Sequence, residues 1–282
     1  MQKIKTISIF TAFLLSISFH GNAQKFIEGV VLDSMAQTPI GYVNIGILEN
    51  ANGTVSNDNG HYRLKVNARD KTIQFSSIGF YSKTFTIKNW NQFDTVFLSP
   101  RAYDLNLIEV NANEFNEDKT LGTIINKKNS RINWERPESL GVEIGVAIKI
   151  RKETLLKSAH FGIHPDVNKS ILLRLNIYEF KKGKARKNLL PENIFVLSKD
   201  LIDYGEIDLS HLNLVVDKDV LVTLQTLEMK DVQKESYLSF MMKFRRKTNI
   251  YYRDAIQAKF KKGLKRGTVP FAQIGCYLKV KQ

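Results

Sequence analysis

The sequence has a single cysteine, Cys276, among its 282 residues. No disulfide can therefore form within the chain and no cysteine-rich zinc site can hold it together, so its stability must come from packing. Cys276 stands in an apolar run typical of a strand, which predicts a buried, unreactive thiol. Proline is also scarce, with 6 residues, and the 16 glycines follow no repeat. Collagen-like and proline-rich classes of protein are excluded.

The motifs of the common enzyme classes are missing as well. No histidine has a glutamate three residues later, as a zinc carboxypeptidase would need, and there is no Gly-x-Ser-x-Gly elbow, phosphate-binding loop or dinucleotide fingerprint. His160 and His164, with His211 further along, could in principle bind a metal, but four residues of strand separate the first two by roughly 13 Å. We therefore expect no catalytic residue, no metal and no cofactor, and an enzyme of an unfamiliar kind remains an alternative.

The N-terminus has the order of a secretory signal. Lys3 and Lys5 precede an apolar run from Ile7 to Phe19, and Gly21-Asn22-Ala23 supplies small residues for cleavage. This pattern predicts a signal peptide over residues 1–23, and export to the periplasm, to the outer membrane or into the medium. No later segment approaches the ~20 apolar residues of a spanning helix, so we expect no transmembrane span in the mature chain.

Charge divides the rest of the chain. The net charge is +14, yet the segment from Gln24 to Val110 holds eight basic and eight acidic residues, so almost all of the excess lies beyond it. An asymmetry of this kind supports a domain boundary near Val110. We predict a first domain over residues 24–110 and a basic second domain over residues 141–282.

The first of these segments has the pattern of a small β-sandwich. Short apolar runs are closed by turn-forming residues, and Tyr62, Leu64 and Val66 alternate onto one face. The turn at Asn57 to Gly60 predicts a hairpin between the runs on its two sides. About seven short strands are expected, at the spacing typical of an antiparallel sandwich.

Spaced motifs in this segment resemble the carboxypeptidase regulatory-like domain. They are Gly29-x-Val31-x-Asp33, Pro39-Ile40, Tyr42-Val43-Asn44-Ile45, Gly53 to Tyr62 and Ser76 to Phe80. The resemblance implies an Ig-like or transthyretin-like sandwich, of a family found at the N-termini of Gram-negative envelope proteins that include nutrient receptors. It implies no catalysis, since the domain is named for its place beside metallocarboxypeptidases. Asn57 stands where the family often has Asp, which argues against a carboxylate site in that loop.

The strand pattern lapses and then returns. Over residues 111–140 we predict a linker, with a short helix suggested by Leu121, Ile124 and Ile125. Eight or nine further apolar runs then predict a second β-sandwich, for which a jelly roll is one topology. In the run from Leu173 to Tyr178 the period is two, which predicts a half-buried strand. The fold class is therefore all-β, with two sandwiches in series.

Basic runs are the most distinctive feature of the second segment. An exported protein seldom meets nucleic acid, so the anions to consider are glycans and lipid surfaces, and solvated hairpins that only aid solubility are the alternative. Tyr178 and Phe244 lie near these runs and could contribute aromatic contacts. The candidate ligand-binding residues are Lys181, Lys182, Lys184, Arg186, Lys187, Arg245, Arg246, Tyr251, Tyr252, Lys261 and Lys262.

Together these features favour a non-catalytic exported module that binds or assembles with other components of the cell envelope. One alternative is a binder of anionic glycans or lipid surfaces through the basic hairpins. Another is an accessory protein to an outer-membrane nutrient-uptake system. The expected partners are an envelope protein, a glycan or an anionic surface, and nucleic acid is not among them.

Overall fold

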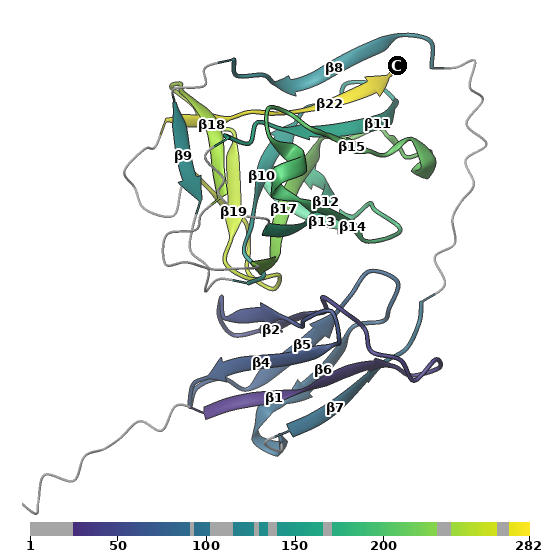
Figure 1. The fold of residues 1–282 in the computed structure, drawn as a ribbon, viewed down its shortest axis with the longest axis vertical. Helices are drawn as coiled ribbons and strands as arrows, with labels where there is room; N and C mark the ends of the chain where they lie inside the picture. The colour runs from purple at the N-terminus through teal and green to yellow at the C-terminus, as the bar shows by residue number, and fades with distance from the viewer. Residues whose placement is uncertain are drawn as a thin grey trace, which may run out of the picture.

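The structure is a computed structural model, and two β-sandwich domains are stacked along its longest axis (Figure 1). It describes residues 25–90, 93–101, 115–126, 130–134, 140–165, 171–229, 238–263 and 271–282. The predicted signal peptide and the predicted boundary at residue 110 lie outside these ranges. Within them, no helix is long and apolar enough to cross a membrane.

The first domain is the sandwich that the sequence predicted. One sheet has the order β4-β1-β7 and the other the order β3-β2-β5-β6. The strands are β1 (Lys25–Asp33), β2 (Asn44–Ile47), β3 (Gly53–Val55), β4 (His61–Val66), β5 (Thr72–Ser76), β6 (Lys83–Thr86) and β7 (Phe93–Leu98). Alternate residues such as Ile27, Leu64 and Phe75 point between the sheets and form one buried core.

Two details of this domain differ from the prediction. The turn at Asn57 to Gly60 forms, but β3 pairs with β2 while β4 pairs with β1, so the hairpin prediction was wrong. The turn instead carries the chain from one sheet to the other. In addition, β1 and β7 pair in parallel, which an alternating sequence pattern cannot distinguish from antiparallel pairing.

The second domain is also all-β. Its largest sheet has the order β13-β12-β17-β10-β19-β20, with β14 on β12, and packs its apolar face against sheets β15-β11-β22-β8 and β21-β18-β9. The strands are β8 (Asp118–Thr123), β9 (Arg131–Trp134), β10 (Glu143–Ile148), β11 (Thr154–Phe161), β12 (Ile171–Lys181), β13 (Lys184–Asn188), β14 (Ile194–Leu197), β15 (Glu206–Asp208), β16 (Val215–Val216), β17 (Val220–Met229), β18 (Leu238–Phe244), β19 (Ile250–Arg253), β20 (Lys261–Lys262), β21 (Ala272–Ile274) and β22 (Cys276–Lys281).

The stretch predicted as a linker contains strands. β8 pairs with β22 over six residue pairs, and β9 pairs with β18, so the described parts of residues 111–140 belong to the sheets of the second domain. The suggested helix is wrong, because Leu121 stands in β8 and packs on the core while Ile124 is exposed. Pairing with strands more than a hundred residues later leaves no signal in a local pattern.

The largest sheet is curled. Neighbouring strands lie ~4.8 Å apart, so β12 and β19, with two strands between them, would be ~14 Å apart in a flat sheet. The ring centroids of Phe180 and Tyr251, which stand on these two strands, are nevertheless 4.9 Å apart. The face that carries them is therefore concave, and it gathers a second apolar cluster around Tyr178 and Leu221.

Candidate functional site

The concave face is polar where it meets the first domain. Arg174 in β12 and Gln225 in β17 are 1% and 0% exposed, although the alternating pattern predicted a strand with one solvated face. That prediction was wrong for β12, because strand β2 of the first domain lies against this end of the sheet (Figure 1). The Arg174 guanidinium therefore lies in the junction between the two domains.

The Arg174 guanidinium is fully hydrogen bonded in this junction. Its Nε and Nη2 donate to the Gln225 Oε1 at 3.0 and 2.6 Å, and Nη2 also donates to Asn44 Oδ1 at 2.9 Å. Its Nη1 donates to the Tyr42 carbonyl at 3.0 Å and to Asn193 Oδ1 at 3.1 Å. Burial lowers the pKa of Arg174 to about 10, which leaves the side chain charged near neutral pH.

Glycines allow the two domains to approach closely. A Cβ on Gly46 would lie 1.6 Å from the Gln257 side-chain oxygen, and one on Gly53 would lie 2.9 Å from the Ala255 Cβ. Both of the Gln257 amide atoms are buried without a hydrogen-bond partner in the described structure. The contact is thus tightly packed but has one polar group whose hydrogen bonds are not satisfied.

Further along the concave face lies a buried ion pair. Arg253 Nε donates to Glu143 Oε2 at 2.7 Å, and both residues are less than 10% exposed. Asn176 Nδ2 donates to Glu143 Oε1 at 3.0 Å, and Arg253 Nη2 donates to the Tyr178 hydroxyl at 2.7 Å. Burial opposes the charge of Arg253, but the Glu143 carboxylate overcomes this effect and raises the pKa of the arginine. These polar groups satisfy one another, so the pair supports the curled sheet.

The basic hairpin lies where the sequence predicted it. Lys182 and Gly183 form the turn between β12 and β13, with φ of 50° and 76°. The candidate residues on this hairpin, Lys181, Lys182, Lys184, Arg186 and Lys187, are all exposed. They stand around a solvated turn, and none of the described pockets includes them.

The second candidate group is divided between core and surface. Tyr251 and Tyr252 are 8% and 6% exposed, so their rings are closed to an external ligand, and their prediction as ligand-binding residues was wrong. Their alternation in β19 places one ring in each of the two cores. Lys261 and Lys262 are exposed on β20, with their Nζ atoms 5.8 Å from the centroids of these rings.

Arg245 and Arg246 line a cleft together with two exposed aromatic rings. The side chains of Phe244 and Phe271 are 66% and 55% exposed, and these four residues line a hollow of about 700 Å³. Antiparallel pairing of β18 with β21 brings the two segments together, and Arg245 N donates to the Phe271 carbonyl at 2.6 Å. Phe244 stands beside a basic run in the sequence, whereas nothing in the sequence singles out Phe271, since only the strand register makes the two neighbours. We call these four residues the aromatic–arginine cleft.

His160 and Cys276 are buried in the second domain. His160 Nδ1 donates to the Tyr204 carbonyl at 3.0 Å, so Nε2 accepts from the Ser158 hydroxyl at 2.9 Å. Both side chains are 2% exposed, which closes the hydroxyl to a substrate. Burial lowers the pKa of His160, and burial raises the pKa of the Cys276 thiol, which is buried as predicted. His211 lies elsewhere, bonded to Glu192, and the described residues hold no cluster of metal-ligand side chains.

Comparisons with known proteins identify the first domain. The family model of the CarboxypepD_reg-like domain matches residues 27–110, which confirms the predicted regulatory-like domain, a non-catalytic Ig-like module. No protein of curated function matches the chain. A solved structure of the streptococcal ancillary pilin is similar at 8% identity and a TM-score of 0.22, over 90% of this chain and 59% of the pilin. The chain thus covers less than two thirds of that protein.

Proposed function

We propose that this chain is a non-catalytic, exported binding module of the cell envelope, and that its second domain binds acidic glycans in the aromatic–arginine cleft. Export is supported by the basic, apolar and small-residue order of residues 1–23. An envelope role is supported by the regulatory-like domain at residues 27–110. The single observation that carries the binding proposal is the pair of exposed rings that line one hollow with Arg245 and Arg246.

The cleft has the two features that recognition of an acidic sugar requires. Exposed aromatic rings offer an apolar face to the C–H groups of a sugar, and arginine presents a planar fork that matches a carboxylate. Phe244 and Phe271 would lose exposed apolar surface on binding. Arg245 and Arg246 are exposed, and neither forms an ion pair with a described residue, so both guanidinium groups are accessible to a ligand.

The basic hairpin serves a different purpose in this proposal. Its four lysines and one arginine are exposed around a solvated turn. They raise the positive potential of the second domain, which speeds the approach of a polyanion without fixing its orientation. Specific binding should therefore depend on the cleft, and the salt dependence should depend on both.

The test is titration calorimetry of the full chain with oligogalacturonate as the acidic glycan and dextran as the neutral one. We expect binding of oligogalacturonate alone, and about a tenfold or greater loss of affinity for Phe244→Ala, Phe271→Ala or Arg245→Gln. Phe93→Ala removes an equally exposed ring, 56% exposed, from the first domain and is the matched control. Equal affinity in the cleft variants, or equal binding of dextran, would contradict the proposal.

Export is tested separately, by cell fractionation and by sequencing of the N-terminus. The protein produced in a Gram-negative host should appear in the periplasmic or membrane fraction with an N-terminus close to Gln24. Recovery of the intact N-terminus from the cytoplasm would rule out this part of the proposal and leave the binding measurement unaffected.

A further inference from the structure

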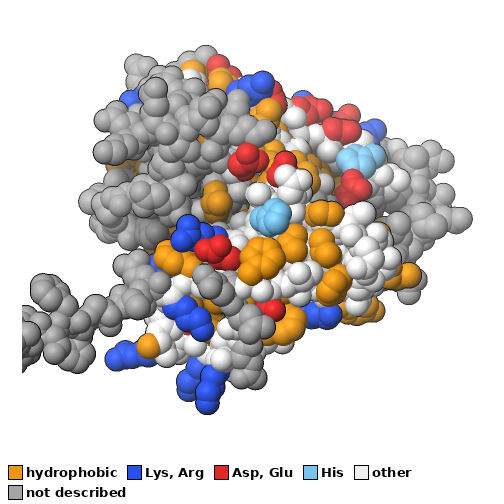
Figure 2. Space-filling view, turned by 60° about the horizontal axis from the view of Figure 1, so that its bottom comes forward, with side chains coloured by type: hydrophobic (Ala, Val, Ile, Leu, Met, Phe, Trp, Pro, Cys, Tyr) orange, Lys and Arg blue, Asp and Glu red, His pale blue; other side chains and the backbone are white. Residues whose placement is uncertain are grey.

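A second hollow lies at the edge of the first domain where β1 begins, and it shares no lining residue with the aromatic–arginine cleft. It has a volume of about 1020 Å³, and three segments converge on it: the start of β1, the loop from β4 to β5 and the residues that follow β6. Figure 2 shows Lys and Arg side chains gathered at the lower left, on the side where β1 begins in Figure 1. The lining residues are Lys25, Lys65, Val66, Asn67, Ala68, Arg69, Asp70, Lys71, Thr86, Ile87 and Lys88.

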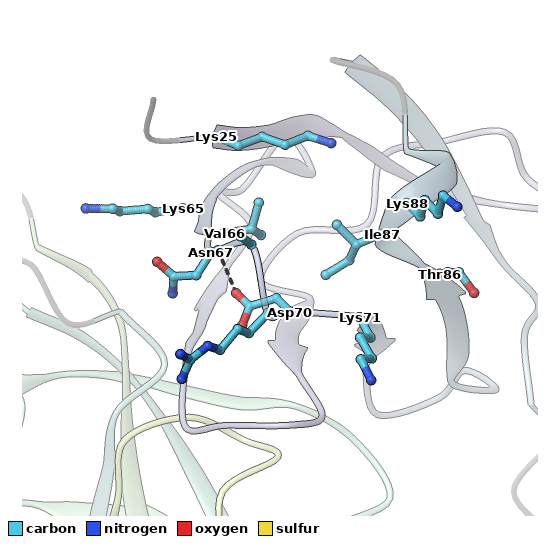
Figure 3. A pocket seen from close by; sticks show the side chains of 11 residues that line it. Lys25, Lys65, Val66, Asn67, Asp70, Lys71, Thr86, Ile87 and Lys88 are labelled. Atoms are coloured by element: carbon cyan, nitrogen blue, oxygen red, sulfur yellow. Dashed lines mark hydrogen bonds between the residues drawn. The ribbon is translucent and has the colours of Figure 1, made fainter. Parts of the chain in front are cut away.

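The floor of this hollow is apolar and its rim is cationic. Val66 and Ile87, 3% and 4% exposed, lie on either side of it, with Lys25 above and Lys71 below in Figure 3. Lys71 and Lys88 are exposed, and neither side chain is paired with an acidic group among the described residues. The segment from Gln24 to Val110 has equal numbers of basic and acidic residues. The local excess of positive charge therefore arises because folding brings these basic side chains together.

The one acidic side chain in the lining is already bonded. Asp70 Oδ1 accepts from Asn50 Nδ2 at 2.7 Å, and Oδ2 accepts from the Asn67 amide at 2.8 Å, so the carboxylate fixes the loop and is only 8% exposed. The amide of Ile87 donates to the Lys71 carbonyl at 2.8 Å, which ties the loop to the segment that follows β6. The cationic groups are thus carried by a braced loop, which lowers the cost of ordering them around a ligand.

We propose that this hollow binds a phosphorylated ligand, with phosphate oxygens at the lysine and arginine rim and the apolar part against Val66 and Ile87. Several ammonium groups around one hollow suit a multiply charged phosphate, because lysine binds phosphate as a flexible point charge. An apolar floor beneath them suits a ligand with a hydrocarbon portion. The same phosphate chemistry is available from a lipid headgroup and from a soluble phosphate ester.

The test compares two phosphate sources on the full chain. Flotation with vesicles of phosphatidylglycerol and phosphatidylcholine measures the lipid source against phosphatidylcholine alone, and calorimetry with pyrophosphate measures the soluble one. In either assay we expect Lys71→Gln/Lys88→Gln to weaken binding about tenfold or more, while Lys71→Arg/Lys88→Arg retains it. The control Lys181→Gln/Lys187→Gln removes the same charge from the β12–β13 hairpin and should have a small effect.

Each outcome decides the proposal. The proposal is supported if the unaltered chain binds in one assay, Lys71→Gln/Lys88→Gln loses that binding and Lys71→Arg/Lys88→Arg keeps it. The assay that shows binding then identifies the phosphate source as the lipid or the soluble ester. No binding in either assay overturns it, and so does an equal loss in the hairpin control, which would indicate diffuse attraction to net charge. The cleft variants Phe244→Ala and Phe271→Ala should leave phosphate binding unchanged, so this result is independent of the acidic-glycan proposal.

Discussion

Arg174 of the second domain donates a hydrogen bond from Nη2 to Asn44 Oδ1 of the first domain at 2.9 Å. The two residues are 130 positions apart in the chain, and both side chains are more than 90% buried. A buried guanidinium is stable only when its donors are satisfied, and here acceptors from both domains are needed to satisfy it. The arginine therefore couples the folding of the second domain to the presence of the first.

This coupling can be measured by a double-mutant cycle. Arg174→Ala should lower the free energy of unfolding by about 3 kcal/mol, because it leaves buried acceptors unpaired and opens a cavity. Asn44→Ala should cost about 1–2 kcal/mol. The double variant should be about 1–2 kcal/mol more stable than the sum of the two losses predicts. Additive losses in urea unfolding would show that the two side chains do not interact.

The same substitution should separate the domains in unfolding. Trp90 lies in the core of the first domain, and Trp134→Phe leaves it as the one tryptophan of the two in the sequence. Fluorescence then follows the first domain, while circular dichroism follows both. We expect coincident transitions in the background variant and two separate transitions after Arg174→Ala. Coincidence in both would contradict the coupling.

Gln257 offers a way to strengthen the junction. Its amide atoms are buried against Gly46 without partners, so they have lost their hydration without gaining hydrogen bonds. The methionine side chain is similar in shape to glutamine and needs no hydrogen-bond partners. Gln257→Met should therefore raise the free energy of unfolding by about 1 kcal/mol. Thermal unfolding is the measurement, and Gln282→Met at the half-buried C-terminal residue is the control. A lower melting temperature for Gln257→Met would contradict the account of this site.

We expect single and double substitutions in the Glu143–Arg253 pair to differ in their effect on the free energy of unfolding. Glu143→Gln leaves the buried arginine without its counter-ion and should cost about 3–5 kcal/mol. Combining it with Arg253→Met removes the unpaired charge and should recover part of that loss. Chemical denaturation of the three variants gives the comparison. A double variant less stable than Glu143→Gln would show that the arginine is held by contacts other than the pair.

We expect the folded protein to lose stability in mild acid because of His160. Burial lowers its pKa in the folded state below the ordinary value of 6.5, with Lys279 adding to the shift and the Tyr204 carbonyl and Glu206 opposing it. The unfolded chain therefore binds the proton more readily. The contribution of neutral His160 to the free energy of unfolding is complete above about pH 6.5. It falls as the pH decreases toward the lowered pKa of the folded state. Unfolding measured at about pH 7.5 and 5 should show a smaller difference for His160→Gln than for the unaltered chain.

Local patterns were sufficient for most of the strands and for the class of the first domain. The first domain has the short strands β1 to β7 that its apolar runs predicted, since short apolar runs between turn residues have few other folds to adopt. The motifs from Gly29 to Phe80 predicted a regulatory-like domain, which the match at residues 27–110 confirms. The basic hairpin at Lys182 and Gly183 also forms as predicted.

Tertiary structure alone decided which of these surfaces are exposed. The alternation in β12 is genuine, but its polar side, with Arg174, is covered by a domain far away in the sequence. Phe271 joins Phe244 only through the register of β18 and β21, and the cationic hollow needs three segments to converge. Sequence determines the direction in which each side chain points along its own strand, whereas burial depends on what packs opposite, and that is a property of the whole chain.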